Sequence, residues 1–169
     1  MMDLDRVNAY MARVEESETK TFKPVSNKLK VGLDLGTAYI VLVVLDEEDN
    51  PIACEKQAAQ VLRDGVVVDY TGARQIVKDL KEKLEERLGT ELVNCAIAMP
   101  AGTESSTKTH QYVAEGAGFE VTNVLDEPTA ANSIYQIEDG VVVDIGGGTT
   151  GLAILKGGKV VQIEDEPTG

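Results

Sequence analysis

Residues 141–155, "VVVDIGGGTTGLAIL", decide the fold of this chain. An apolar run ends in an aspartate, three consecutive glycines and two threonines follow, and a second apolar run begins. This pattern predicts two strands joined by a turn of exposed backbone. Because glycine has no Cβ, the N–H groups of such a turn can approach an anion closely. The stretch indicates a phosphate-binding turn, although a glycine-rich hairpin without a ligand has the same pattern.

Asp144 stands at the end of the first apolar run, beside the predicted phosphate. A carboxylate next to a phosphate repels it unless a divalent cation lies between them, so the turn also predicts Mg²⁺. Residues 31–44, "VGLDLGTAYIVLVV", repeat the pattern with Asp34, Gly36 and Thr37. Two such hairpins are more specific than one, and they predict two loops that close on one polyphosphate.

Composition limits the class of protein. A chain of 169 residues with 43% hydrophobic residues can build one ordinary core, and its net charge of -13 argues against nucleic acid and anionic membranes as partners. No stretch has the roughly 18 apolar residues of a membrane span, and the acidic N-terminus does not fit a signal peptide, so we expect a cytoplasmic protein. Cys54 and Cys95 lie far apart in apolar surroundings, which predicts buried free thiols.

The chain begins with a short amphipathic helix, predicted for residues 1–20, and an extended linker at 21–28. Docking of this helix on its own domain is favoured over docking on a partner. From residue 29 onward, strands alternate with helices, which predicts an α/β fold with a mixed sheet that opens with an antiparallel three-strand meander and carries helices on both faces. The predicted strands are 29–35, 39–46, 51–57, 93–99, 121–125 and 159–164 besides the glycine hairpin, with helices at 71–88, up to about 117, and from 128.

Two helix positions carry specific expectations. Thr71 is expected to cap the helix that Gly89 ends. Glu127 is expected to be held extended by Pro128, as a cap at the end of the sheet that carries Asp34 and Asp144. Three carboxylates at two phosphate loops suit metal-assisted phosphoryl transfer, two holding hydrated Mg²⁺ and one positioning water. A plain helix cap at Glu127 is the alternative.

His110 is the single histidine, so Ser/His/Asp catalysis or a histidine zinc site would have to be built on it. Its polar neighbours predict an exposed helix face.

The stretches "VGLDLGTAY", "LDEPTAA" and "VVDIGGGTTGLAIL", in this order and spacing, resemble the phosphate motifs of the actin-like ATPase superfamily. That superfamily includes actin, sugar kinases, seventy-kilodalton heat-shock chaperones and MreB. The resemblance implies a ribonuclease H-like domain with a mixed five-stranded sheet over residues 29–169, and it implies ATP or ADP with Mg²⁺ as ligands.

Carried over to this chain, the resemblance implies that Asp34 and Asp144 bind Mg²⁺ through water and that Glu127 orients the hydrolytic water. The residues implied for the two phosphate loops are Gly36, Thr37, Ala38, Gly146, Gly147, Gly148, Thr149 and Thr150. Two departures stand out. No lysine can be assigned to the γ-phosphate, and the sequence stops at "EDEPTG", where the second lobe is expected to begin. We therefore expect a piece of a two-lobed protein that is inactive alone and prone to self-association through the surface meant for the second lobe.

Within the superfamily, "VLRDGVVVDYTGARQIV" and "VDIGGGTTGLAILKGGKV" are most similar to the chaperone-like family of ethanolamine-utilisation operons, which serve bacterial microcompartments. This implies an ATP-binding and ATP-hydrolysing chaperone or assembly factor whose partners are ethanolamine-utilisation enzymes or the microcompartment shell, to which the N-terminal helix would direct it. A non-catalytic scaffold that keeps the fold is the alternative; filament formation as in MreB and sugar kinase activity are weaker ones.

Overall fold

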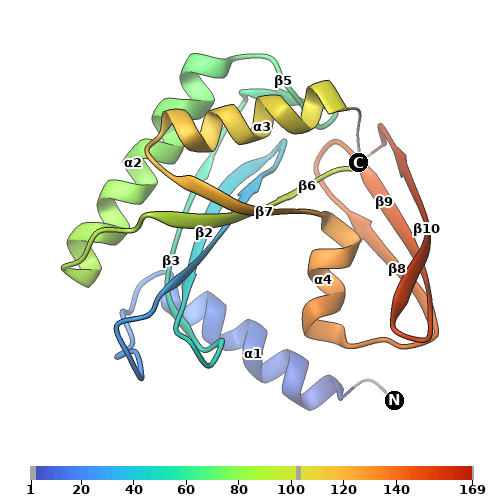
Figure 1. Ribbon diagram of the computed structural model, residues 1–169, viewed down its shortest axis with the longest axis horizontal. Helices are drawn as coiled ribbons and strands as arrows, with labels where there is room; N and C mark the ends of the chain where they lie inside the picture. Colours follow the sequence, from blue (N-terminus) through green and yellow to red (C-terminus); the bar gives the residue numbers. More distant parts are fainter. Residues whose placement is uncertain (1–2, 102–103, 169) are drawn as a thin grey trace.

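The computed structural model describes residues 3–101 and 104–168, and its largest element is a five-stranded sheet of order β3-β2-β1-β6-β7 (Figure 1). Strands β1 to β3 form an antiparallel meander, whereas β6 and β7 run parallel to β1. This arrangement confirms the predicted mixed sheet, and the parallel pairs follow the helical crossovers. The strands are β1 (Lys30–Leu35), β2 (Tyr39–Leu45), β3 (Pro51–Ala58), β6 (Asn94–Met99) and β7 (Glu120–Asp126).

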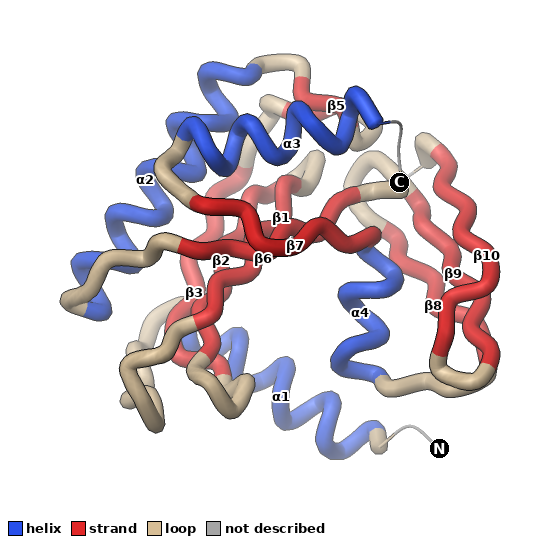
Figure 2. The backbone as a smooth tube through the Cα atoms, in the orientation of Figure 1, coloured by secondary structure: helices blue, strands red, loops and turns tan. Residues whose placement is uncertain are grey.

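A second, three-stranded sheet of order β10-β9-β8 contains the glycine hairpin. Figure 2 shows this sheet apart from the first, with helix α4 (Glu127–Tyr135) between them. The expectation that Asp34 and Asp144 end strands of one sheet is therefore wrong, because β8 pairs only with β9 among the described strands. Alternating apolar patterns predict strands but do not say which sheet a hairpin joins. The strands are β8 (Gly140–Ile145), β9 (Thr150–Lys156) and β10 (Lys159–Glu166).

Helices cover both faces of the larger sheet, as predicted: α2 (Tyr70–Leu88) and α3 (Glu104–Gly116) on one side, α1 (Leu4–Ser17) and α4 on the other (Figure 1). The stripe of α2 that enters the core is fully buried at Ala73, Val77, Leu80 and Leu84. No helix within residues 3–101 and 104–168 is long and apolar enough to cross a membrane.

The cap of α2 is Asp69, whose side chain accepts a hydrogen bond from Gly72 N at 2.9 Å, so the expectation for Thr71 is wrong by two residues. Aspartate is a stronger cap than threonine, and it begins the helix earlier. Gly89 ends the helix as predicted, in the left-handed conformation with φ 66°.

His110 is fully buried, with Nδ1 2.9 Å from Ser106 O, so the expected exposed position is wrong. The polar neighbours gave a misleading signal, because one residue of a helix can face the core while those beside it in sequence do not. Cys54 and Cys95 are buried free thiols, as predicted.

The N-terminal helix docks on its own domain through Arg87 of α2. The Arg87 guanidinium donates to Ser17 O at 2.8 Å, to Cys54 O at 2.8 Å and to Glu55 Oε1 at 2.7 Å. A single side chain thus joins α1, β3 and α2. The segment after the helix is also held, since Phe22 N donates to Ile52 O at 2.9 Å.

Arg87→Ala is expected to lower the free energy of unfolding by about 2–4 kcal/mol, because it removes a charge-assisted hydrogen-bond set and leaves half-buried carbonyls and Glu55 unpaired. Urea denaturation followed by circular dichroism measures the change. Lys83→Ala, on the exposed side of the same helix, is the matched control and is expected to change stability little. Equal stability of the two variants would contradict the structural role of Arg87.

Candidate functional site

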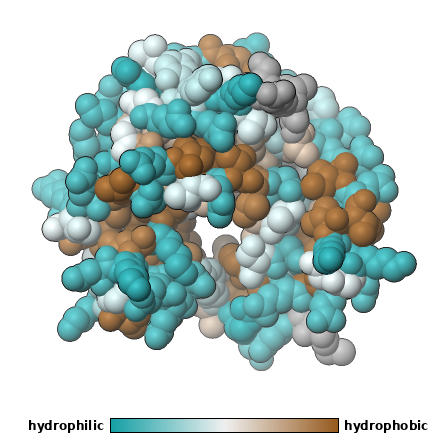
Figure 3. All heavy atoms as spheres, viewed as in Figure 1, coloured by the Kyte–Doolittle hydropathy of each residue, from teal (hydrophilic) through white to brown (hydrophobic). Residues whose placement is uncertain are grey.

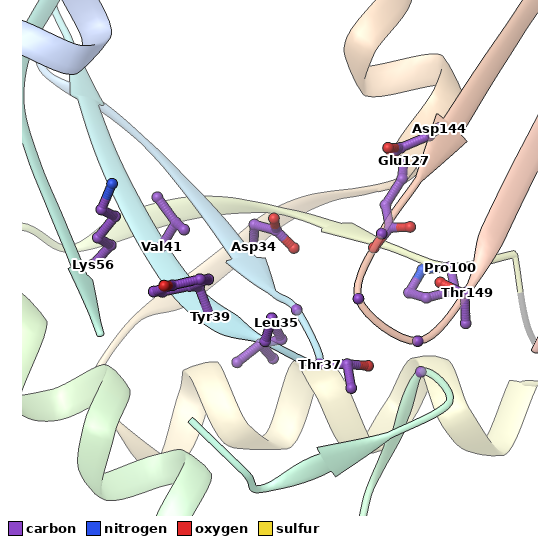
Figure 4. Close-up of a pocket in the computed structure, with 16 residues that line it drawn as sticks. Asp34, Leu35, Thr37, Tyr39, Val41, Lys56, Pro100, Glu127, Asp144 and Thr149 are labelled. Carbon is purple, nitrogen blue, oxygen red and sulfur yellow. The ribbon is translucent and has the colours of Figure 1, made fainter. Parts of the chain in front are cut away.

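The two Asp-Gly hairpins face each other across a pocket of about 300 Å³ (Figure 4). One comes from the five-stranded sheet and the other from the three-stranded sheet, so the pocket lies between the sheets. Ten of the residues named from sequence line it: Asp34, Gly36, Thr37, Ala38, Glu127, Asp144, Gly146, Gly147, Gly148 and Thr149.

Thr150 is the predicted loop residue that does not line the pocket. It is the first residue of β9 and pairs with Ile145, which is 72% exposed on the outer face of its sheet. Its hydroxyl donates to Thr168 O at 2.6 Å. Thr149 lies before β9, outside the strand, and its side chain is buried and lines the pocket.

The tips of the two loops touch, and the contact requires glycine. A Cβ on Gly148 would lie 2.6 Å from Thr37 Oγ1, and a Cβ on Gly147 would lie 2.9 Å from Ala38 Cβ. Gly36 has a separate constraint, since its Cβ would lie 2.7 Å from Tyr39 O in the turn of the first hairpin. The glycines therefore allow two backbones from different sheets to meet at the end of the pocket.

Glu127 is the first residue of α4, and the cap is Asp126, whose carboxylate accepts a hydrogen bond from Thr129 N at 2.8 Å. The expectation that Glu127 itself caps the helix is wrong, because the extended conformation falls one residue earlier, at Asp126 with φ -70° and ψ 150°. Because Asp126 makes the cap, the Glu127 side chain is not needed for it and lines the pocket near Asp144 (Figure 4).

The three pocket carboxylates hold protons more tightly than usual. Burial, reinforced by Asp144, raises the pKa of Asp34 to about 6. Burial, reinforced by Asp34 and Asp144, raises the pKa of Glu127 to about 8, and burial also raises that of Asp144. Clustered acids in a confined site are typical of functional pockets, since a structure that needed only stability would avoid them.

The donor set fits a hard divalent cation. Asp34 Oδ1 is buried and accepts no hydrogen bond within the described part of the chain. Carboxylate oxygens facing a phosphate-sized space suit Mg²⁺, which keeps several waters and takes one or two carboxylates. Within residues 3–101 and 104–168, no three acids, histidines or cysteines are grouped closely enough to ligate a metal directly.

Several pocket residues were missed by sequence reasoning, among them Lys56, Gly65 and Pro100. Gly65 sits in the turn between β4 (Leu62–Arg63) and β5 (Val66–Val67), at φ 72°, and a Cβ there would lie 2.9 Å from Pro100 Cγ. The dipeptide Asp64-Gly65 is typical of a turn, but nothing local in the sequence indicates that this turn reaches the pocket. Lys56 carries no sequence signal either, since its place depends on strand register.

Comparisons with known proteins identify the family of the chain. Residues 53–169 match the family described as MreB/Mbl protein. The ethanolamine utilization protein EutJ of Escherichia coli (strain K12) is 45% identical over 141 residues, 83% of this chain and 50% of that protein. The crystal structure of EutJ from Carboxydothermus hydrogenoformans is 44% identical with a TM-score of 0.89, over 96% of this chain and 61% of that one. The chain spans about half the length of the curated EutJ relatives it matches.

More distant relatives extend the comparison. A chaperone protein HscA homolog of Chromobacterium violaceum is 37% identical over 102 residues, 57% of this chain and 16% of that protein. MreB 5 of Spiroplasma citri, solved bound to AMPPNP, has 23% identity and a TM-score of 0.63, over 84% of this chain and 53% of that one. Identity at that level shows the fold alone, and the predicted actin-like ATPase fold is confirmed.

Proposed function

Because the chain belongs to the MreB/Mbl protein family and is 44–45% identical to EutJ proteins over 141 residues, we propose that it is the phosphate- and metal-binding part of an ATP-binding, chaperone-like protein of ethanolamine utilisation. The observation that carries the proposal is the pocket, in which two glycine loops touch beside three partly buried carboxylates. Its partners are ethanolamine-utilisation enzymes or the microcompartment shell, in a cytoplasmic setting.

Each residue has a role in this proposal. The backbone N–H groups of the two loops would bind the phosphates of ATP or ADP, and Asp34 and Asp144 would hold Mg²⁺ through water, which would supply positive charge to offset the phosphates beside these acids. Glu127 orients a water for attack on the terminal phosphate, where its raised pKa suits proton transfer near neutral pH. The domain division, with residues 1–28 as helix and linker and 29–169 as the nucleotide-binding part, belongs to the same proposal.

Isothermal titration of the full-length protein with Mg-ATP tests the proposal. Wild type is expected to bind, and Asp144→Ala to weaken binding at least about tenfold, because the metal loses one of its two anchoring carboxylates. Asp139→Ala, an acid in the loop before β8, is the matched control and is expected to bind like wild type. Absence of binding by wild type, or equal binding by wild type and Asp144→Ala, would refute the proposal.

A scaffold that keeps the fold without turnover is the second candidate, and one observation favours it. Lys56, the cationic side chain in the described pocket lining, forms an ion pair with Glu18 at 2.7 Å instead of facing the phosphate loops. Phosphate release no greater than that of a Glu127 variant would support this candidate over an ATPase.

Self-association is also proposed, through the outer face of the three-stranded sheet. Val141, Val143 and Ile145 are 50%, 52% and 72% exposed there, and Figure 3 shows apolar side chains gathered over this sheet. Exposed apolar patches of this kind mark contact surfaces.

A further inference from the structure

Lys56 lines the pocket but has no role in the nucleotide binding proposed above. Among the described residues that line the pocket it is the single cationic side chain, facing a cluster of acids. Register places it: Lys56 lies opposite Val41, and Val41 lies opposite Asp34. Residues directly opposite one another in neighbouring strands share a face of the sheet, so Lys56 and Asp34 share the pocket face.

The separation is within the reach of a long side chain. Two strand spacings put the Cα atoms of Lys56 and Asp34 about 10 Å apart. The lysine stem is flexible and carries its charge at the tip, so Nζ can approach a phosphate held beside Asp34. In the structure the side chain instead extends away from Thr37 and the first phosphate loop (Figure 4).

Glu18, at the C-terminal end of α1, holds Lys56 in this withdrawn position. Glu18 Oε1 lies 2.7 Å from Lys56 Nζ. The acid is itself anchored, because its N–H donates to Glu15 O at 3.2 Å and Arg87 Nη1 donates to its carbonyl at 3.4 Å. The side chains of Lys56 and Glu18 remain 45% and 29% exposed. Partly exposed ion pairs contribute little stability, so a more highly charged anion can displace Glu18.

We propose that Lys56 selects the terminal phosphate of a bound nucleoside triphosphate, and that Glu18 of the N-terminal helix competes with that phosphate for the lysine. The inference rests on the proposed nucleotide binding. A triphosphate places more negative charge near Asp34 than a diphosphate does, and a lysine there favours the more charged ligand. Helix α1 is thereby coupled to the pocket, because Glu18 at its C-terminal end controls whether the Lys56 ammonium group is available to bind phosphate.

Isothermal titration of the full-length protein with Mg-ATP and Mg-ADP tests this, using Lys56→Met, Glu18→Gln and the double variant. Lys56→Met is expected to weaken the binding of Mg-ATP about tenfold and the binding of Mg-ADP less than about twofold, because one charge-assisted contact with the terminal phosphate is lost. Glu18→Gln is expected to strengthen Mg-ATP about threefold by freeing the lysine, and the double variant to behave like Lys56→Met. Lys30→Met is the matched control, since Lys30 on β1 also forms an ion pair of 2.7 Å, with Asp49, away from the pocket.

The outcomes separate this inference from the proposed function. Equal weakening of ATP and ADP by Lys56→Met, no weakening of either, or weaker ATP binding by Glu18→Gln would overturn the role of Lys56 while nucleotide binding stands. If wild type binds neither nucleotide, the proposed function fails, and the selection of phosphate by Lys56 fails with it. A changed ATP-to-ADP ratio in Lys56→Met, with the ratio of Lys30→Met unchanged, supports the inference.

Discussion

Glu127→Gln is expected to lower ATP hydrolysis by the full-length protein about 10²–10⁴-fold while Mg-ATP binding is kept, the range typical of removing a general base. Glutamine matches glutamate in shape but cannot accept the proton of the attacking water. The helix start survives the change because Asp126, and not Glu127, caps α4. Binding is expected to hold because the loops and the two aspartates that approach the metal are untouched.

Single-turnover phosphate release and titration with Mg-ATP, measured on the same preparations, separate hydrolysis from binding. Glu120→Gln is the matched control. This acid is exposed at the start of β7, the strand that leads directly into Glu127. Hydrolysis by Glu127→Gln at the wild-type rate would show that Glu127 has no part in the chemistry. Wild-type phosphate release no faster than that of a sample without protein would favour the scaffold.

Much of the fold and the site was predictable because the decisive signals are local. The strand and helix pattern follows from hydrophobic spacing, and the antiparallel meander follows from short turns. The two loops that we propose bind phosphate were predicted from their glycines, and the structure explains Gly147 and Gly148 by their contacts with Ala38 and Thr37. Such contacts leave a mark in sequence, because a position that admits no Cβ must be glycine.

The features that escaped prediction depend on long-range register. The division into two sheets could not be predicted from the sequence. Strands β8 to β10 would show the same pattern of apolar runs and turns whether they joined the sheet of β1 to β3 or formed a sheet of their own. Lys56 enters the pocket only because β3 pairs with β2 at Val41. The caps at Asp69 and Asp126 differ from the predictions by two positions and one position, because nearby residues of similar chemistry competed for one structural role. The burial of His110 escaped prediction because its sequence neighbours are polar.

The nucleotide-free protein is expected to lose stability as pH rises from about 5 to about 8.5, by about 3 kcal/mol. The sign follows from the pocket acids. Asp34 and Glu127 have folded-state pKa values of about 6 and about 8, both above the values of unfolded chains. The folded state therefore binds more protons across this range, and stability falls as each acid ionises. The expected loss of stability is smaller than the free energy that the two full pKa shifts would give together. Glu127 is only half-buried, and the ionisation of each acid depends on that of the other.

Urea denaturation at a series of pH values measures the trend, and variants assign it. Asp34→Asn and Glu127→Gln are each expected to flatten the curve, Asp34→Asn below about pH 6 and Glu127→Gln up to about pH 8, because each acid contributes between its unfolded-chain pKa and its folded-state pKa. Glu120→Gln controls for the general effect of net charge and is expected to keep the wild-type slope. Saturating Mg²⁺ with ATP should reverse the trend, because a cation held by these acids binds their ionised forms and so stabilises the protein most at high pH. A wild-type curve that rises from pH 5 to pH 8.5 without ligand would contradict the electrostatics of the pocket, whereas a falling curve that neither variant flattens would place its cause elsewhere.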